Sequence, residues 1–163
     1  MVIQEKIEIS APLNVVWHVF SSLAEWGTWN SVCQDCCLVT SQEMEAGACF
    51  SFKIRPYYLP IKISPQITKC EAGREVVWEG RRLGIHAVHR FDFQEIDDRV
   101  VLTSTEKFGG PLFFLARLLF IPQQLHRLTK KLLAEIKQAA EACILGTTEP
   151  GKLKNQHFKN FRG

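Results

Sequence analysis

The spacing of hydrophobic residues along the chain changes twice. Over residues 2–9 polar and apolar positions alternate, which is typical of a β-strand, and Ser10-Ala11-Pro12 ends this segment. Apolar residues then recur at helical spacing from Leu13 to Leu23, and a second short helical segment with two tryptophans covers 24–30. The pattern predicts one strand followed by two short helices.

Alternation with a period of two returns in the middle of the chain. Six segments rich in β-branched and aromatic residues, each bounded by turn residues, are predicted strands: 32–40, 48–55, 60–70, 74–82, 85–96 and 99–107. Pro65 should interrupt pairing within its strand, because proline has no backbone N–H. The connections are short, so we expect antiparallel neighbours.

A long helix is predicted after Gly109-Gly110-Pro111 and should run to about Leu145. Its expected buried stripe consists of Leu125, Leu128, Leu132, Ile136, Ala139, Ala140 and Cys143. The order of elements predicts an α+β fold in which a seven-stranded curved antiparallel sheet grips this C-terminal helix, with two short helices after the first strand. We expect the domain to cover 1–146 and a basic, flexible tail to cover 147–163.

Composition and charge exclude several classes of protein. The chain has 163 residues, of which 46% are hydrophobic and 23% charged, which is typical of one globular domain. Residues 1–148 carry 16 basic and 16 acidic side chains, so this part is neutral and does not indicate nucleic-acid binding. No secretory signal or membrane-spanning stretch is visible. We therefore expect a cytoplasmic protein with free thiols.

Several short motifs, taken in order, resemble those of a known superfamily. They are Ile9-Ser10-Ala11-Pro12 followed by Val15-Val16-Trp17, Trp26-Gly27-Thr28-Trp29, Gly47 before a strand, Val77-Trp78-Glu79-Gly80, His89-Arg90-Phe91-Asp92-Phe93 and Thr105-Glu106-Lys107-Phe108-Gly109. From residue 1 to about 145 the chain resembles the START-like, helix-grip (SRPBCC) superfamily, and within it the polyketide cyclase/dehydrase and lipid-transport branch.

The resemblance implies an apolar cavity between sheet and helix that binds a hydrophobic small molecule such as a lipid, an isoprenoid or a polyketide, for transport or sensing. It implies no cofactor and no single chemistry, because one fold can serve many functions. A cyclase or dehydratase is the alternative from a different class. A third alternative is a module that contacts a protein or a membrane surface.

The last two strands can be aligned from their alternation. If Asp97-Asp98 is the turn, Ile96 faces Arg99 and His89 faces Glu106. The histidine and the carboxylate then lie on an aromatic face that looks at the helix. Such a pair could orient a ligand or act as an acid/base pair, or the two groups could satisfy each other as a structural pair.

Aromatic residues on the same face predict the remainder of the site. Phe50, Phe52 and Ile54 share one face of their strand, and Trp78 lies on a neighbouring strand. The expected ligand-binding residues are Phe50, Phe52, Ile54, Trp78, His89, Phe91, Phe93, Leu102, Ser104 and Glu106. These residues wall a cavity in one interpretation and pack against the helix in the other.

Other features give weaker indications. The cluster Cys33, Cys36 and Cys37 lacks the second close pair of ligands that a zinc site normally has, so no metal is expected. No nucleophile elbow, P-loop or dinucleotide motif is present. The apolar segment 111–122 could form a lid, could touch a membrane surface together with the basic tail, or could pack as an ordinary helix start.

Overall fold

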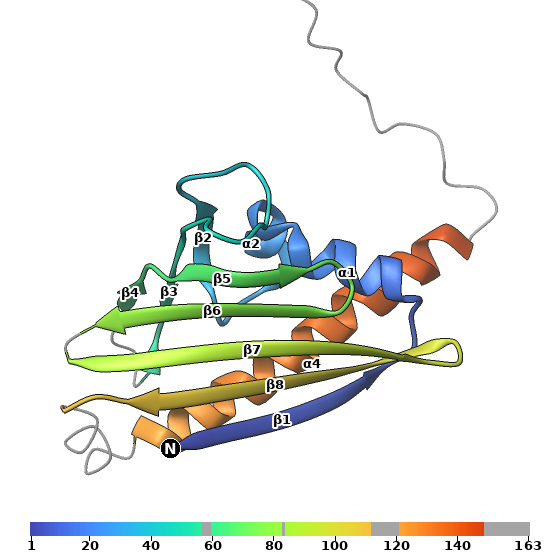
Figure 1. Cartoon of the computed structure of the whole chain (residues 1–163). Helices are drawn as coiled ribbons and strands as arrows, with labels where there is room; N and C mark the ends of the chain where they lie inside the picture. The colour runs from blue at the N-terminus through green and yellow to red at the C-terminus, as the bar shows by residue number, and fades with distance from the viewer. Residues whose placement is uncertain (57–59, 83, 112–120, 149–163) are drawn as a thin grey trace, which may run out of the picture.

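The computed structural model describes residues 1–56, 60–82, 84–111 and 121–148 (Figure 1). The elements before the central strands are β1 (Val2–Ile9), α1 (Leu13–Ser21), the 3-10 turn η1 (Leu23–Glu25) and α2 (Trp26–Trp29). The later elements are β2 (Gln34–Leu38), β3 (Phe50–Ile54), β4 (Ile61–Ile63), β5 (Gln66–Glu71), β6 (Glu75–Arg82), β7 (Ile85–Ile96), β8 (Arg99–Gly109) and α4 (Ile121–Thr148). The predicted α+β order is confirmed.

The strands form two hydrogen-bonded groups that continue into one another. Five strands pair in the order β1-β8-β7-β6-β5, and three pair in the order β2-β3-β4. The predicted strand 60–70 is divided at Pro65 into β4, which pairs with β3, and β5, which pairs with β6. A bridge between Cys49 and Gln66 joins the two groups. The fourth of the seven expected strands is therefore two short ones, because proline cannot donate to the ladder.

The hairpin formed by β7 and β8 has the predicted register. Ile96 pairs with Arg99 and His89 pairs with Glu106, with no irregularity along the hairpin. Asp97 in the turn has a φ of 53°, a left-handed conformation that aspartate tolerates better than most residues. The turn therefore fixes which side chains of both strands face the helix.

Helix α4 lies across the concave side of the curved sheet (Figure 1). It continues to Thr148, past the expected end near Leu145, because one glycine inside a helix costs only about 1 kcal/mol. Leu132, Ile136 and Ala140 are buried as predicted, whereas Cys143 is exposed because the end of α4 extends beyond the sheet. Among the described residues, no helix is both long and apolar enough to span a membrane.

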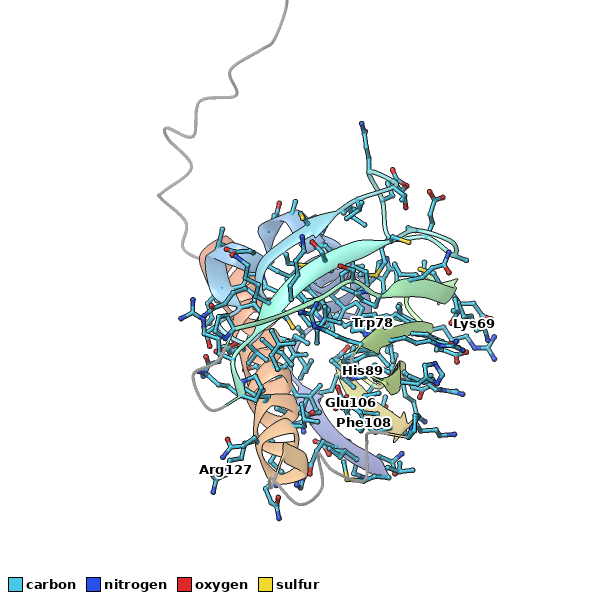
Figure 2. The ribbon with its side chains drawn as sticks, turned by 90° about the vertical axis from the view of Figure 1, so that its left-hand side faces the viewer. Lys69, Trp78, His89, Glu106, Phe108 and Arg127 are labelled. Atoms are coloured by element: carbon cyan, nitrogen blue, oxygen red, sulfur yellow. The ribbon has the colours of Figure 1, made fainter. Side chains whose placement is uncertain are left out.

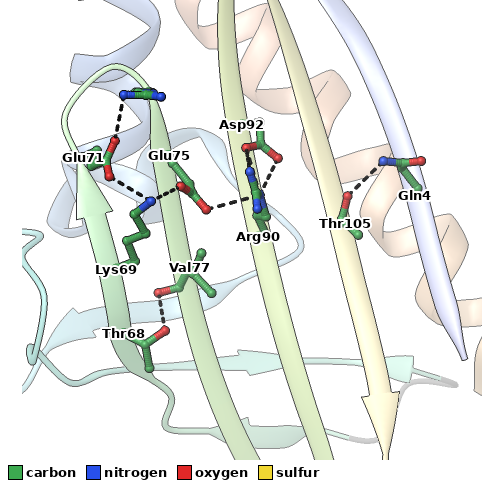
Figure 3. A network of polar contacts seen from close by, with 10 residues as sticks. Gln4, Thr68, Lys69, Glu71, Glu75, Val77, Arg90, Asp92 and Thr105 are labelled. Atoms are coloured by element: carbon green, nitrogen blue, oxygen red, sulfur yellow. Dashed lines mark hydrogen bonds and ion pairs between the residues drawn. The ribbon is translucent and has the colours of Figure 1, made fainter.

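The opposite face of the sheet is polar. Lys69 lies on the side of the sheet away from α4, whereas His89 and Glu106 lie on the side of the helix (Figure 2). Lys69 contacts the carboxylates of Glu71 at 2.8 Å and Glu75 at 2.5 Å (Figure 3). These contacts raise the pKa of Lys69, and the contact with Lys69 lowers the pKa of Glu71. Lys69 is exposed, whereas Glu75 is buried beneath it. The charged network thus identifies the outer face.

Aromatic side chains close one end of the space between sheet and helix. Phe20 of α1 is fully buried and has its ring centroid 4.9 Å from that of Phe91 and 5.0 Å from that of Phe93. Trp26 and Trp78 lie against the same ring at 5.7 and 6.1 Å. Complete burial of such a side chain contributes about 1.5–3 kcal/mol, so this cluster is a substantial part of the core.

Candidate functional site

A cavity of about 210 Å³ lies between the sheet and α4. Strand residues contribute Phe52, Ile54, Ile61, Ile63, Trp78 and Phe108 to its wall, and α4 contributes Leu125, Leu128, Thr129 and Leu132. The wall is largely apolar, with His89 and Glu106 as polar groups on the sheet side. An apolar cavity with a few converging polar groups is the usual form of a small-molecule site.

The cavity exists because side chains become small along one row of the sheet. Pairing across β6, β7 and β8 places Gly80, Ala87 and Phe108 in one row. The next row toward the aromatic cluster consists of Trp78, His89 and Glu106. Gly80 and Ala87 leave space open in the first row, and the larger side chains of Trp78, His89 and Glu106 bound that space in the next row.

The polar end of the cavity is a chain of three side chains. Nδ1 of His89 lies 2.8 Å from Oε1 of Glu106, and its Nε2 lies 2.7 Å from Oγ of Ser104. The His89 ring stacks on Phe91 with a centroid distance of 4.0 Å, which fixes its plane. Ser104 is fully buried and does not line the cavity, whereas Glu106 does. The hydroxyl therefore lies behind the ring and the carboxylate faces the cavity.

The proton positions in this chain follow from the partners. With Glu106 ionised, the carboxylate can only accept, so Nδ1 of His89 carries a proton and donates it. In the neutral ring, Nε2 then accepts the proton of the Ser104 hydroxyl. Both ring nitrogens are thus engaged within the protein. A molecule in the cavity would meet Glu106 rather than a free imidazole nitrogen.

Thr129 contacts the same carboxylate from the helix. Its Oγ1 lies 3.2 Å from Oε2 of Glu106 and 3.0 Å from the carbonyl oxygen of Leu125, one turn earlier in α4. A threonine hydroxyl has one proton and can satisfy either acceptor. When another donor binds Oε2 of Glu106, the Thr129 hydroxyl can turn to the Leu125 carbonyl and remain bonded. A ligand can therefore donate a hydrogen bond to Oε2 of Glu106 without leaving the Thr129 hydroxyl unpaired.

The buried thiol of Cys33 lies on the cavity wall, and the half-buried thiol of Cys36 lies three residues further along the chain. Burial raises the pKa of the Cys33 thiol well above its usual range, and Cys36 and Glu106 act in the same direction. Burial also raises the pKa of Cys36 to about 12. A thiol that keeps its proton is a poor nucleophile and a poor metal ligand. Over the described residues, no cluster of three or more His, Cys, Asp or Glu side chains could hold a metal ion.

The predicted site residues divide into two groups in the structure. Phe52, Ile54, Trp78, His89 and Glu106 lie on the cavity wall. The others are buried beyond the cavity wall and belong to the packed core or to the hydrogen-bond chain: Phe50, Phe91, Phe93, Leu102 and Ser104.

Sequence reasoning missed several wall residues. Thr129 and Leu125 fall on the predicted buried face of α4, so helical spacing could have indicated them. Cys33 lies on the wall, although its spacing to Cys36 and Cys37 first drew attention to metal binding. The segment 111–122, for which a lid was one interpretation, falls on residues 112–120 that lie outside the described part of the chain.

A curved antiparallel sheet that grips a long helix over an apolar cavity defines a START-like, helix-grip protein. Three solved structures have this fold in common with the chain. The Zhui aromatase/cyclase of a Streptomyces species has a TM-score of 0.77 and 12% identity, covering 88% of this chain and 95% of that one. A START superfamily protein of Mycobacterium smegmatis has a TM-score of 0.64 and 11% identity, with coverages of 90% and 99%.

The third structure is norcoclaurine synthase of Thalictrum flavum, solved with dopamine and hydroxybenzaldehyde, with a TM-score of 0.65, 14% identity and coverages of 91% and 88%.

Residues 1–141 match the family model of polyketide cyclase / dehydrase and lipid transport. The chain belongs to this family. No curated protein matches the chain significantly. The low identities relate these structures to the chain by fold alone.

Proposed function

We propose that this protein binds a hydrophobic small molecule, such as a lipid, an isoprenoid or a polyketide, in the cavity between the sheet and α4. The observation that carries the proposal is the cavity itself, which has a largely apolar wall with the Glu106 carboxylate facing it at one end. Apolar contacts such as those with Phe52, Trp78 and Leu128 provide affinity. Glu106, oriented by His89, accepts a hydrogen bond from a hydroxyl or N–H of the ligand.

The direct test is native mass spectrometry of gently purified protein, followed by solvent extraction and identification of any bound molecule. A stoichiometric hydrophobic passenger, or saturable uptake of a neutral apolar dye, supports the proposal. A protein that carries nothing and takes up no dye contradicts it. In that case the aromatic face is closed core, and an interaction module becomes the better explanation.

The second candidate is a cyclase or dehydratase, favoured by the ordered chain Ser104–His89–Glu106 beside an apolar cavity. Two of the similar folds are named as an aromatase/cyclase and a synthase. In a dehydration, Glu106 would take a proton from the carbon next to a carbonyl and return it to the departing hydroxyl. The C–H and C–O bonds break, a C=C bond forms and water leaves.

The two functions predict different effects of one substitution. Glu106→Gln removes the proton acceptor but retains the shape of the side chain. An enzyme loses kcat with KM largely unchanged, whereas a binding protein loses only part of its affinity for hydroxyl-bearing ligands. Incubation of the wild type with β-hydroxy thioesters, monitored by mass spectrometry for loss of water, first shows whether the protein catalyses dehydration.

A further inference from the structure

The cavity has a second charged end, opposite in sign to the first. Arg81 and Arg82 border it at the end of β6, and both are exposed, so the cavity meets solvent there. Of the described wall residues, only these two arginines and the His89–Glu106 pair have ionisable side chains other than thiols. One end of an otherwise apolar space is therefore cationic and the other contains a carboxylate.

The register of the sheet places Arg82 on the cavity face. Arg82 pairs with Ile85, and side chains alternate along β6, so Arg82 shares its face with Trp78 and Gly80. Arg82 lies four positions along β6 from Trp78, which is in the row of His89 and Glu106, and this corresponds to about 13 Å along the strand. The distance between the two charged ends is thus similar to the length of an amphiphile with a hydrocarbon chain of about eight to ten carbons.

Arg82 has no counter-charge in the described part of the chain. Neither Arg81 nor Arg82 has a carboxylate within 4.0 Å among these residues, whereas Arg90 contacts Asp92 at 2.6 Å on the outer face. Glu106 is not the partner of Arg82. Its carboxylate contacts His89 and Thr129, in the row of the sheet next to the one that contains Gly80. Arginine presents a planar fork of N–H donors that matches carboxylate and phosphate oxygens.

We infer that the ligand is an amphiphile with an anionic head, a carboxylate or a phosphate, bound by Arg82 at the mouth, with its apolar body in the cavity. This inference rests on the proposed function. The Glu106 carboxylate repels an anion from the inner end, while the guanidinium attracts it at the mouth, so the ligand enters with its head outward. A hydroxyl or N–H at the inner end donates to Glu106.

The test compares three probes with the same hydrocarbon chain: octanoic acid, octyl phosphate and octanol. Isothermal titration calorimetry gives Kd for each probe with the wild type and with Arg82→Gln. The anionic probes should bind the wild type about tenfold more tightly than octanol, and Arg82→Gln should remove most of this difference. The preferred anion, octanoate or octyl phosphate, identifies the head group. Higher salt should weaken only the anionic probes, because the contact is at the surface.

Arg127→Gln is the matched control. Arg127 lies on the outside of α4, with its side chain pointing away from the cavity (Figure 2). This variant loses the same charge without touching the mouth, so its affinity for octanoate should equal that of the wild type. Arg82→Lys retains the charge and should recover part of the affinity. Circular dichroism of each variant checks that the fold is intact.

The outcomes separate this inference from the function on which it rests. If octanol binds as tightly as both anions, or if Arg127→Gln weakens octanoate as much as Arg82→Gln does, the anionic-head inference is overturned while cavity binding stands. If none of the three probes binds and no passenger is found, the proposed function fails as well.

Discussion

His89 and Glu106 are direct partners across the β7–β8 hairpin, and their side chains meet with Nδ1 2.8 Å from Oε1. The exposed fractions of these side chains are only 10% and 16%. Polar groups so far removed from water are costly unless they are hydrogen-bonded, and the Glu106 carboxylate contacts both His89 and Thr129. Each member of the pair thus supplies a hydrogen bond that the other would otherwise lack.

Removal of the Ser104 hydroxyl should destabilise the protein without changing the cavity. Ser104→Ala leaves Nε2 of His89 buried without a partner, which costs about 1–3 kcal/mol. Urea unfolding measures this loss, and binding of an apolar probe should be retained because Ser104 is not a wall residue. Thr103→Ala on the outer face is the control and should change the free energy of unfolding by less than about 0.5 kcal/mol. Equal effects of the two substitutions would contradict this assignment.

The two members of the pair should respond differently to substitution. His89→Ala leaves the Glu106 carboxylate with Thr129 as its only hydrogen-bond donor among the described residues, and it should lower the free energy of unfolding by about 2–3 kcal/mol. In Glu106→Gln, the amide oxygen can still accept the Nδ1 proton, so the loss should stay within about 1 kcal/mol. Denaturant titration of both variants checks the order. A larger loss for Glu106→Gln would mean that the charge, rather than the hydrogen bond, stabilises the pair.

The register of the site could be predicted from the sequence, because it depends on local rules. A two-residue turn at Asp97-Asp98 and strict alternation determine that His89 faces Glu106. The bond from His89 to Ser104 follows the same geometry, since Ser104 lies two residues from Glu106 and diagonal to His89. Pro65 likewise breaks its strand for a local reason, the missing N–H.

The division between cavity wall and closed core could not be predicted in the same way. Phe52 and Phe50 have the same spacing and chemistry, yet Phe52 borders the cavity while Phe50 packs against Trp78 at 5.1 Å. The difference depends on which neighbouring side chains each ring meets in the folded protein. The contact of Thr129 with Glu106 depends on the rotation of α4 about its axis. Neither is specified by periodicity, because both result from packing of distant segments.

Filling the small-residue row should abolish ligand uptake while preserving the fold. Ala87 lies between Gly80 and Phe108, and Ala87→Leu places a larger apolar side chain into the cavity. Affinity for a neutral apolar dye should fall at least about tenfold, and stability should be unchanged or slightly higher because a void is filled. Val88→Leu, on the outer face, is the control and should bind the dye normally. Normal dye binding by Ala87→Leu would show that the dye occupies another place.

The half-buried thiol of Cys36 should make the protein less stable in alkali. Its ordinary pKa is 9.0, and burial raises the pKa in the folded protein to about 12. Between these two values the unfolded chain releases the proton while the folded protein retains it, so rising pH favours unfolding. Stability is therefore fully present below pH 9 and declines toward pH 12. The raised pKa of Cys33 acts in the same direction.

Thermal unfolding as a function of pH tests this expectation. The fall in Tm above pH 9 should be shallower in Cys36→Ala than in the wild type, since one buried thiol no longer resists ionisation. Cys37→Ala removes the exposed neighbouring thiol and leaves Cys36 in place, so it should follow the wild-type slope. If the plots of Tm against pH for Cys36→Ala and the wild type are parallel, the pKa of Cys36 is not raised in the folded protein. The thiol then reaches solvent readily.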